Sequence, residues 1–329
     1  MRLSAPEFWQ RDSALATLLT PVGWAVGTVG ALRWRVAHPY APGVPVICVG
    51  NLVVGGAGKT PVAIDLAERL AAKGTRPHIL TRGYGGTLAG PVLVDPARHT
   101  AEDVGDEPML LARVAPTWVA RERHRGAAAA VAAGAGILVL DDGFQNPGLR
   151  QDLRILVVDG RIGFGNGRIL PAGPLREPIA AGLARTDVVV LMGEDERNLA
   201  PLFAGKTLLR ARLAPRAEAP PLQGRDFVAF AGIGSPEKFF GFLRSAGARL
   251  VETRRFPDHQ PYDELILAPL LREARRRNVP LLTTEKDLVR VPTALRGEIM
   301  AFPVMVQWQD ETAPSRLLAA IVELALHHG

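Results

Sequence analysis

The sequence has very little cysteine and few aromatic residues. Its 329 residues include one cysteine, Cys48, which excludes an intrachain disulfide framework and argues against a cysteine-based zinc site. Such cysteine usage is typical of a reducing compartment such as the cytoplasm. Aromatic residues make up 6% of the chain and none interleaves the basic run Arg275–Arg277. The run therefore lacks the aromatic side chains on which nucleic-acid bases would stack. We interpret that run as a solvated helix end and expect no nucleic-acid partner.

The composition is that of a basic globular protein. Hydrophobic residues make up 47% of the chain and charged residues 22%, which argues against disorder. A chain of this length is typical of about two domains. The net charge of +6 supplies counter-charge for phosphates in nucleotides, nucleic acid or lipid headgroups, without choosing among them.

Charged residues are absent from Ala14–Leu32, a run of nineteen residues. As a helix the run would be roughly 28 Å long, just short of a bilayer core of about 30 Å. Pro21 and three glycines leave it only mildly apolar, and Arg33 and Arg35 follow it together with Trp34. Tryptophan beside arginine favours a helix lying at a headgroup interface. An ordinary buried helix and a true membrane span remain the alternatives.

Beyond residue 36, short apolar runs alternate with helical stretches, which predicts a mostly parallel sheet covered on both faces. The candidate strands of the first half are 44–50, 77–81, 91–94, 117–120, 137–140, 154–159 and 187–192. We therefore predict an α/β fold: a doubly wound sheet like that of P-loop NTPases, with a second, smaller α/β lobe and an N-terminal apolar helix.

The domain boundaries follow from composition. Residues 1–36 are predicted as a membrane-interface helical segment, 37–206 as the larger α/β core domain and 207–329 as the smaller α/β unit. The proline-rich stretch Ala214–Pro221 indicates a linker or an exposed bend. Segments 207–213 and 301–308 are expected to be strands that bracket the second unit.

The strongest motif is a glycine-rich loop between a predicted strand and a predicted helix. Its residues are Val54, Gly55, Gly56, Ala57, Gly58, Lys59 and Thr60. The glycines let backbone N–H groups close around phosphate oxygens, Lys59 places a charge on the β- and γ-phosphates, and the Thr60 hydroxyl coordinates Mg²⁺. Val53 stands where the usual pattern has glycine, so the loop is a variant P-loop. It predicts binding of ATP with Mg²⁺.

A second motif places acids at the end of another strand. Four apolar residues, Ile137–Leu140, precede Asp141 and Asp142. Two carboxylates at a strand's end are costly unless a cation meets them. Beside a P-loop that cation would be Mg²⁺.

Three further segments offer chemistry with open alternatives. Asp106 and Glu107 stand before a predicted helix at 109–114, either favouring its dipole or supplying the base that a kinase needs. Arg176 lies in a proline-flanked loop, where it could stabilise charge during phosphoryl transfer. His259 lies in a loop of the second unit, and a lone histidine is more often structural than catalytic.

The ordered set of motifs resembles the tetraacyldisaccharide 4′-kinase family of lipid A biosynthesis. The motifs are GNLVVGGAGKTP (50–61), RGYGG (82–86), GDEP (105–108), LDDGFQ (140–145), GPLREP (173–178), FPDH (256–259) and TTEKD (283–287). The resemblance spans nearly the whole chain. It departs at Asn146 and Gln260, where the family often has histidine.

The resemblance implies a reaction and a location. The family transfers the γ-phosphate of ATP to the 4′-hydroxyl of a tetraacylated glucosamine disaccharide 1-phosphate, using Mg²⁺. The partners would be this lipid-linked disaccharide and the membrane surface, on the cytoplasmic face of the bacterial inner membrane. No obligate protein partner is indicated.

The resemblance also implies roles for single residues. Asp106 would be the general base, assisted by His259. The other residues expected to act in catalysis are Lys59, Asp142 and Arg176. Nucleotide contacts are expected from the P-loop (54–60), Gln145 and Arg123. Metal contacts are expected from Thr60, Asp141, Asp142, Glu107 and Glu177. The acceptor is expected to meet Tyr84 and Asp106.

One competing interpretation is a membrane-associated switch ATPase or GTPase acting through a protein partner. The P-loop and the apolar N-terminal segment fit it. However, Thr284–Asp287 is only a poor match to the guanine-reading Asn-Lys-x-Asp sequence.

Overall fold

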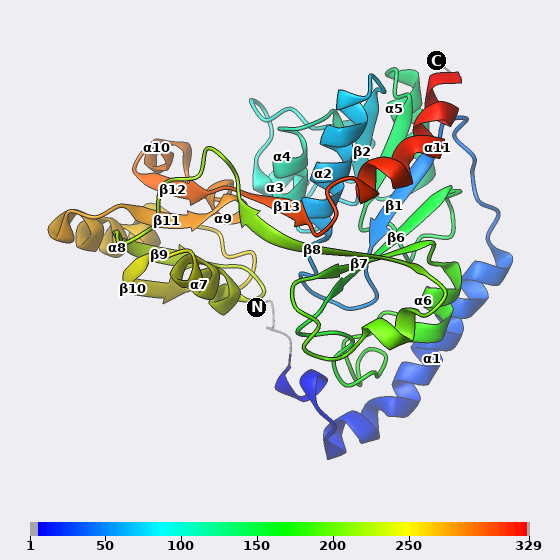
Figure 1. The fold of residues 1–329 in the computed structure, drawn as a ribbon, viewed down its shortest axis with the longest axis horizontal. Helices are drawn as coiled ribbons and strands as arrows, with labels where there is room; N and C mark the ends of the chain where they lie inside the picture. The colour runs from blue at the N-terminus through cyan, green and yellow to red at the C-terminus, as the bar shows by residue number, and fades with distance from the viewer. Residues whose placement is uncertain (1–5, 328–329) are drawn as a thin grey trace.

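The computed structural model describes residues 6–327, which form a large and a small lobe, each built on its own sheet (Figure 1). The large sheet has the strand order β13-β8-β7-β6-β1-β5-β2-β4-β3. Its strands are β1 (Val46–Gly50), β2 (Pro77–Thr81), β3 (Val92–Leu93), β4 (Thr117–Val119), β5 (Ile137–Asp141), β6 (Leu153–Asp159), β7 (Val188–Met192), β8 (Thr207–Pro215) and β13 (Val304–Trp308). The pairs β3–β4 and β8–β13 are antiparallel, and the other neighbours are parallel. The predicted fold class is confirmed.

Helices cover both faces of the large sheet. They include α2 (Lys59–Ala72), α5 (Arg123–Ala132), α6 (Ile179–Arg185) and α11 (Ala313–His327). Successive residues of a strand point to opposite faces, so Val46 and Cys48 of β1 pack in the core with α5 and α6. Ile47 and Val49 pack in the opposite core, with α2 and α11. This two-sided burial is why β1 is apolar throughout.

The small lobe repeats the pattern on a smaller scale. Its parallel sheet has the order β10-β9-β11-β12, and a helix packs on each face. The strands are β9 (Asp226–Ala231), β10 (Arg249–Arg255), β11 (Leu281–Thr284) and β12 (Ile299–Phe302). The helices are α7 (Pro236–Ser245), α8 (Glu264–Arg277), α9 (Glu285–Leu288) and α10 (Thr293–Arg296). The basic run 275–277 ends α8, where its arginines pair with Glu273 and Glu298.

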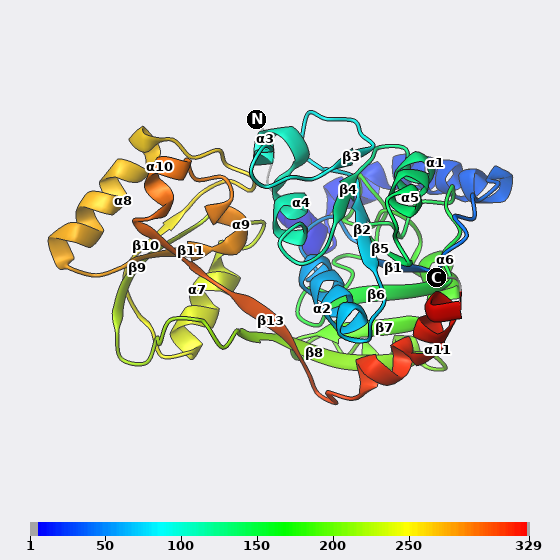
Figure 2. The same cartoon turned by 90° about the horizontal axis from the view of Figure 1, so that it is seen from above.

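Two strands, β8 and β13, flank the small lobe in the sequence but lie in the large sheet. β8 pairs with β7 on one side and with β13 on the other. Trp308 of β13 packs in the large core, and its indole donates to Asp65 of α2 at 2.9 Å. Figure 2 shows β8 and β13 running between the lobes, with α11 back on the large one. Alternating apolar residues predict a strand, but its partners are decided by which core accepts its side chains.

The predicted N-terminal helix is α1 (Ala14–Val36), capped by the Ser13 side chain. Gly23 and Gly27 face the large lobe, where a Cβ on Gly23 would lie 2.7 Å from the carbonyl oxygen of Ile169. The outward face exposes large apolar side chains: Leu15, Leu18, Val22, Trp24, Val26, Val29, Leu32 and Val36. The alternative prediction of an ordinary buried helix is therefore wrong. By length and composition α1 could cross a membrane, with a mean hydropathy of 1.5.

Short helices complete the described chain. They are η1 (Glu7–Gln10), α3 (Ala101–Val104), α4 (Asp106–Leu111) and η2 (Ala200–Phe203). In η1 the Trp9 indole donates to the carbonyl oxygen of Pro171 at 3.1 Å, which fastens this segment to the same loop that receives α1.

Candidate active site

The loop between β1 and α2 has the backbone of an anion-binding turn. Gly55 and Gly58 have φ angles of 116° and 90°, which residues with a side chain rarely adopt. A Cβ on Gly55 would meet open space, so backbone conformation is what favours glycine there. Val53 is buried and forms an antiparallel bridge with Leu175. The unusual valine therefore ties the P-loop to the loop that carries Arg176.

Lys59 begins α2 and points toward the ends of β1 and β5. Its Nζ donates to Asn51 Oδ1 at 3.0 Å and lies 3.6 Å from Asp142 Oδ1. Burial lowers the pKa of Lys59, and the charge of Asp142 opposes that shift. An ammonium group has three donors, so Lys59 can meet phosphate oxygens as well as these partners.

Asp141 ends β5, the direct neighbour of β1, and Asp142 follows it. Asp141 accepts from the Thr60 hydroxyl through Oδ2 at 3.1 Å, while its buried Oδ1 has no partner among the described residues. Burial raises the pKa of Asp141 to about 7. Burial by itself would raise the pKa of Asp142. The positive charges of Lys59 and Arg176 outweigh this effect and hold the pKa of Asp142 below its usual value.

Arg176 and Glu177 approach the acid pair from the loop before α6. Arg176 pairs with Asp142 at 2.8 Å, and its guanidinium also donates to Gln145 at 3.3 Å. Gln145 in turn donates to Glu177 at 3.0 Å. Arg185 takes the other oxygen of Glu177 and stacks on the Trp34 ring of α1, 4.2 Å from its centroid. A chain of polar contacts thus joins α1 to the acid pair.

Asp106 and His259 meet between the lobes. The predicted helix begins at Asp106, three residues earlier than expected, so this buried carboxylate lies in the first turn of α4. His259 Nδ1 lies 2.7 Å from Asp106 Oδ2. The Tyr84 ring lies 5.5 Å from the His259 ring, centroid to centroid. His259 has a φ angle of 59°, an uncommon conformation for a residue with a side chain.

The remaining predicted metal ligands are paired with cations. Glu107 contacts Lys286 at 2.7 Å, and Glu177 contacts Arg185. Across residues 6–327, no group of three histidine, cysteine or acidic side chains is arranged to hold a metal ion. The role of Glu107 and Glu177 as metal ligands stays a prediction. Mg²⁺ commonly uses one or two carboxylates plus substrate phosphates, and of the predicted acids Asp141 has a buried carboxylate oxygen without a partner among the described residues.

Arg123 lies at the start of α5, apart from these contacts. It is 6% exposed, donates to the carbonyl oxygen of Ala120, and leaves its buried Nε without a partner in the described chain. Burial and the nearby Arg82 lower its pKa to about 10. Its predicted nucleotide contact stays a prediction.

Comparison with known proteins decides the family. Residues 15–323 match the family model described as tetraacyldisaccharide-1-P 4′-kinase. The chain belongs to this family. It is 52% identical over 334 residues to the tetraacyldisaccharide 4′-kinase of Rhodospirillum centenum, with 99% of each chain covered. It is 53% identical over 319 residues to that of Gluconacetobacter diazotrophicus, covering 96% of this chain and 97% of the relative.

A solved structure agrees with this membership. The chain resembles LpxK from Aquifex aeolicus, whose structure is described as the "apo" form in complex with ATP. The TM-score is 0.77 at 29% identity, covering 94% of this chain and 99% of that one. The predicted family and the prediction of a kinase are confirmed, and the switch ATPase or GTPase is not favoured.

Four side chains that contact the predicted site residues were not predicted from the sequence. They are Asn51, Arg185, Lys286 and Arg290. Asn51 and Lys286 lie inside the GNLVVGGAGKTP and TTEKD motifs, so the motifs could have pointed to them. Arg185 and Arg290 lie outside the quoted motifs, and their contacts with Trp34 and Asp106 join segments that are far apart in sequence.

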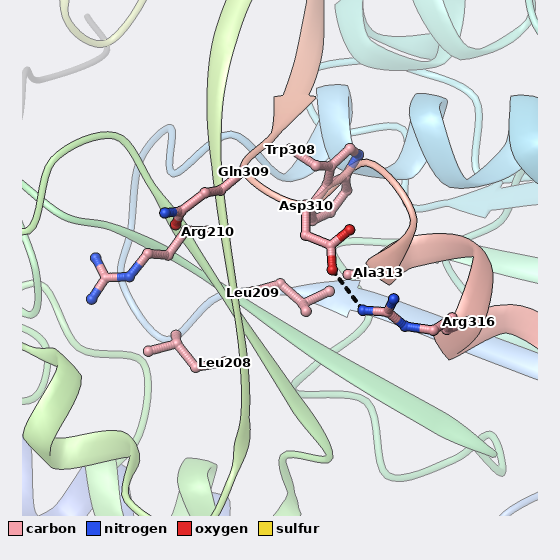
Figure 3. A pocket seen from close by; sticks show the side chains of 8 residues that line it. All are labelled: Leu208, Leu209, Arg210, Trp308, Gln309, Asp310, Ala313 and Arg316. Atoms are coloured by element: carbon pink, nitrogen blue, oxygen red, sulfur yellow. Dashed lines mark hydrogen bonds and ion pairs between the residues drawn. The ribbon is translucent and has the colours of Figure 1, made fainter.

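A separate cavity of about 350 Å³ lies where β8, the end of β13 and the start of α11 meet (Figure 3). It is lined by Leu208, Leu209, Arg210, Trp308, Gln309, Asp310, Ala313 and Arg316. Asp310 and Arg316 pair with each other at 2.6 Å. None of the predicted site residues lines this cavity.

Proposed function

We propose that this chain transfers the γ-phosphate of ATP to the 4′-hydroxyl of tetraacyldisaccharide 1-phosphate, giving the 1,4′-bisphosphate. The observation that carries the proposal is the 2.7 Å contact between Asp106 and His259, in a chain of the 4′-kinase family. A buried carboxylate held by histidine is suited to accept a hydroxyl proton.

Asp106 acts as the base. The 4′-hydroxyl gives its proton to the Asp106 carboxylate while its oxygen bonds to the γ-phosphorus. The bond from that phosphorus to the β–γ bridging oxygen breaks, and ADP leaves. His259 holds Oδ2 of Asp106, and Tyr84 beside it offers an exposed ring to the acceptor sugar.

Lys59 and Arg176 offset charge on the phosphates. Phosphoryl transfer requires little covalent chemistry from the protein, so positioning and charge neutralisation dominate. Both cations contact Asp142, which keeps them together at the mouth of the P-loop. The P-loop backbone, with Gln145 and Arg123, completes the proposed nucleotide contacts.

The residues present fit Mg²⁺. Asp141 Oδ1 is a buried carboxylate oxygen without a partner among the described residues, and the Thr60 hydroxyl lies beside the same carboxylate. When bound, Mg²⁺ would neutralise the charge that develops on the phosphates during transfer. Asp141 and Thr60 would hold it, with Asp142 nearby.

Mg²⁺ affinity is expected to rise with pH. Protons compete with the metal for Asp141, whose pKa is about 7. Between about pH 6 and about pH 8 we expect the affinity to increase about tenfold, measured by calorimetry with a non-hydrolysable ATP analogue. Asp141→Asn is the control. The nucleotide phosphates still titrate in that experiment, but the side chain at position 141 does not. An equal pH dependence in both proteins would contradict the assignment.

The outward face of α1 is proposed to rest on the cytoplasmic face of the bacterial inner membrane. Burying each large apolar side chain contributes about 2 kcal/mol, and Arg33 and Arg35 are exposed where lipid phosphates could meet them. The lipid acceptor is then met at the surface that holds it.

Glutamate on that face is expected to release the protein. The double variant Leu18→Glu/Trp24→Glu should bind anionic lipid vesicles at least about tenfold more weakly in co-sedimentation, because it places charges where apolar contact is lost. Leu18 and Trp24 are 75% and 68% exposed, so the fold should persist. The control is Leu265→Glu, an 85% exposed site on α8. Full retention by vesicles would refute the anchoring face.

The decisive test is transfer of radiolabel from ATP to purified tetraacyldisaccharide 1-phosphate. We expect label in the lipid and release of ADP only with the acceptor present. Steady hydrolysis that ignores the lipid would instead support an ATPase that acts by another route.

A further inference from the structure

The segment Thr283–Arg290 of the small lobe packs against α4, the helix that carries the proposed base. It spans the end of β11, all of α9 and the turn that follows. Two of its cations reach the large lobe: Lys286 contacts Glu107 at 2.7 Å, and Arg290 lies 3.3 Å from Asp106. The reaction described above gives this segment no role.

Arg290 brings a buried positive charge to the proposed base. Its side chain is 4% exposed, and its Nε lies 3.3 Å from Asp106 Oδ2. His259 Nδ1 reaches the same oxygen at 2.7 Å. Among the described residues both contacts fall on Oδ2, so Oδ1 is the oxygen left to face an acceptor hydroxyl.

The small lobe fixes the guanidinium in place. Arg290 Nη1 donates to the carbonyl oxygen of Gln260 at 3.0 Å, and Nη2 donates to the carbonyl oxygen of Gly232 at 2.9 Å. Nη2 also contacts Asp287 at 2.7 Å. A planar guanidinium with three fixed partners has little freedom to turn. Since Gln260 follows His259 directly, Arg290 also holds the histidine loop.

Asp287, the carboxylate partner of Arg290, is itself held in place by hydrogen bonds within the small lobe. It is fully buried and accepts from the Gly232 N–H at 2.8 Å and from the Tyr262 hydroxyl at 2.7 Å. Burial, and then the adjacent carboxylate, raise the pKa of Tyr262, so its hydroxyl remains a donor. The Thr284 hydroxyl contacts the second oxygen of Asp287 at 2.6 Å.

We propose that Arg290 is a positioning residue for phosphoryl transfer, an inference that rests on the proposed function. It docks the small lobe on α4 and holds Asp106 Oδ2 together with His259, so that Oδ1 is presented to the acceptor. Asp287 sets the orientation of the guanidinium. The TTEKD motif and Arg290, three residues beyond it, thus form the element that holds Asp106 of the large lobe against His259 of the small lobe.

A purely structural role makes a different prediction. An arginine that only stabilises the small lobe would lower transfer whether or not Asp106 is intact. A positioning residue acts through Asp106, so its loss matters little once the carboxylate is gone.

The test compares Arg290→Gln in the wild-type and Asp106→Asn backgrounds, with kcat and KM measured for ATP and for the lipid acceptor. With Asp106 present we expect kcat to fall about tenfold to a hundredfold, because a base misplaced by about 1 Å loses that much. The KM for ATP should stay within about twofold of the wild-type value. Adding Arg290→Gln to the Asp106→Asn protein should lower kcat by no more than about twofold further. Arg290→Lys should recover part of kcat, and Arg276→Gln, an exposed arginine of α8, should be neutral.

Hydrogen exchange supplies a readout that does not depend on activity. In Arg290→Gln we expect faster amide exchange in residues 101–111 and unchanged exchange in α2, which the small-lobe segment does not hold. Unchanged exchange at 101–111, unchanged kcat, or an equal loss in both backgrounds would overturn the proposal. If Arg290→Gln does not fold, Arg290→Lys carries the same comparisons. A wild-type chain that fails to label the lipid refutes the proposed function, while the exchange comparison still decides the docking role.

Discussion

Replacing Asp106 with alanine is expected to lower kcat by about 10²–10⁴-fold while ATP still binds. Asp106 is 5% exposed and contacts His259 and Arg290, both from the small lobe, and its ion pairs within residues 6–327 do not include Lys59 of the P-loop. Removing it deletes proton acceptance but leaves the phosphate-binding groups intact. Single-turnover kinetics with the lipid acceptor, together with calorimetry of ATP binding, would measure the two effects separately.

Two companion variants make the result interpretable. Asp106→Asn keeps the side-chain volume and should lose kcat similarly, with a smaller change in melting temperature, since His259 and Arg290 keep a polar partner. Glu196→Ala removes an exposed carboxylate of the same lobe and should be neutral. Loss of ATP affinity in a folded Asp106→Ala protein would instead make Asp106 a nucleotide or metal ligand.

Replacing Lys59 with methionine is expected to lower kcat/KM for ATP by about 10²–10⁴-fold, the effect of removing one partner of a buried charge pair. Methionine keeps the apolar stem of the side chain but supplies no charge to the β- and γ-phosphates. Arg176 and Asn51 remain, so the loop should keep its shape. Titration of nucleotide binding and radiolabel transfer would follow the loss.

Lys73→Met is the matched control, because Lys73 is exposed at the other end of α2. Its replacement removes the same charge from the same helix without approaching the phosphates. Nucleotide affinity and transfer within about threefold of wild type in Lys59→Met would show that the loop does not act as a P-loop.

Local patterns predicted most of the elements, because they depend on neighbours in sequence. Apolar runs such as Val46–Gly50 and helical spacing after Lys59 required no knowledge of distant residues. The strand–loop–helix order also placed the P-loop, and acids at the end of Ile137–Leu140 could be expected at the same edge of a parallel sheet. The N-terminal apolar helix is likewise predicted by its run of uncharged residues, whereas only the structure shows that its apolar face is exposed.

Contacts between distant segments could not be predicted in the same way. His259 alone has the features of an ordinary loop histidine, and only the docking of the small lobe brings it within 2.7 Å of Asp106, 153 residues away. Arg290 carried no motif of its own for the same reason.

The sequence by itself determined that this chain has a phosphate-binding loop, a paired acid at a neighbouring strand and an apolar helix before them. Tertiary structure decided that β8 and β13 join the large sheet, that Glu107 and Glu177 are paired with Lys286 and Arg185, and that the proposed base is assembled from two lobes. The physical reason is that local propensity is set within a few residues, whereas burial and charge pairing depend on which surfaces meet after folding.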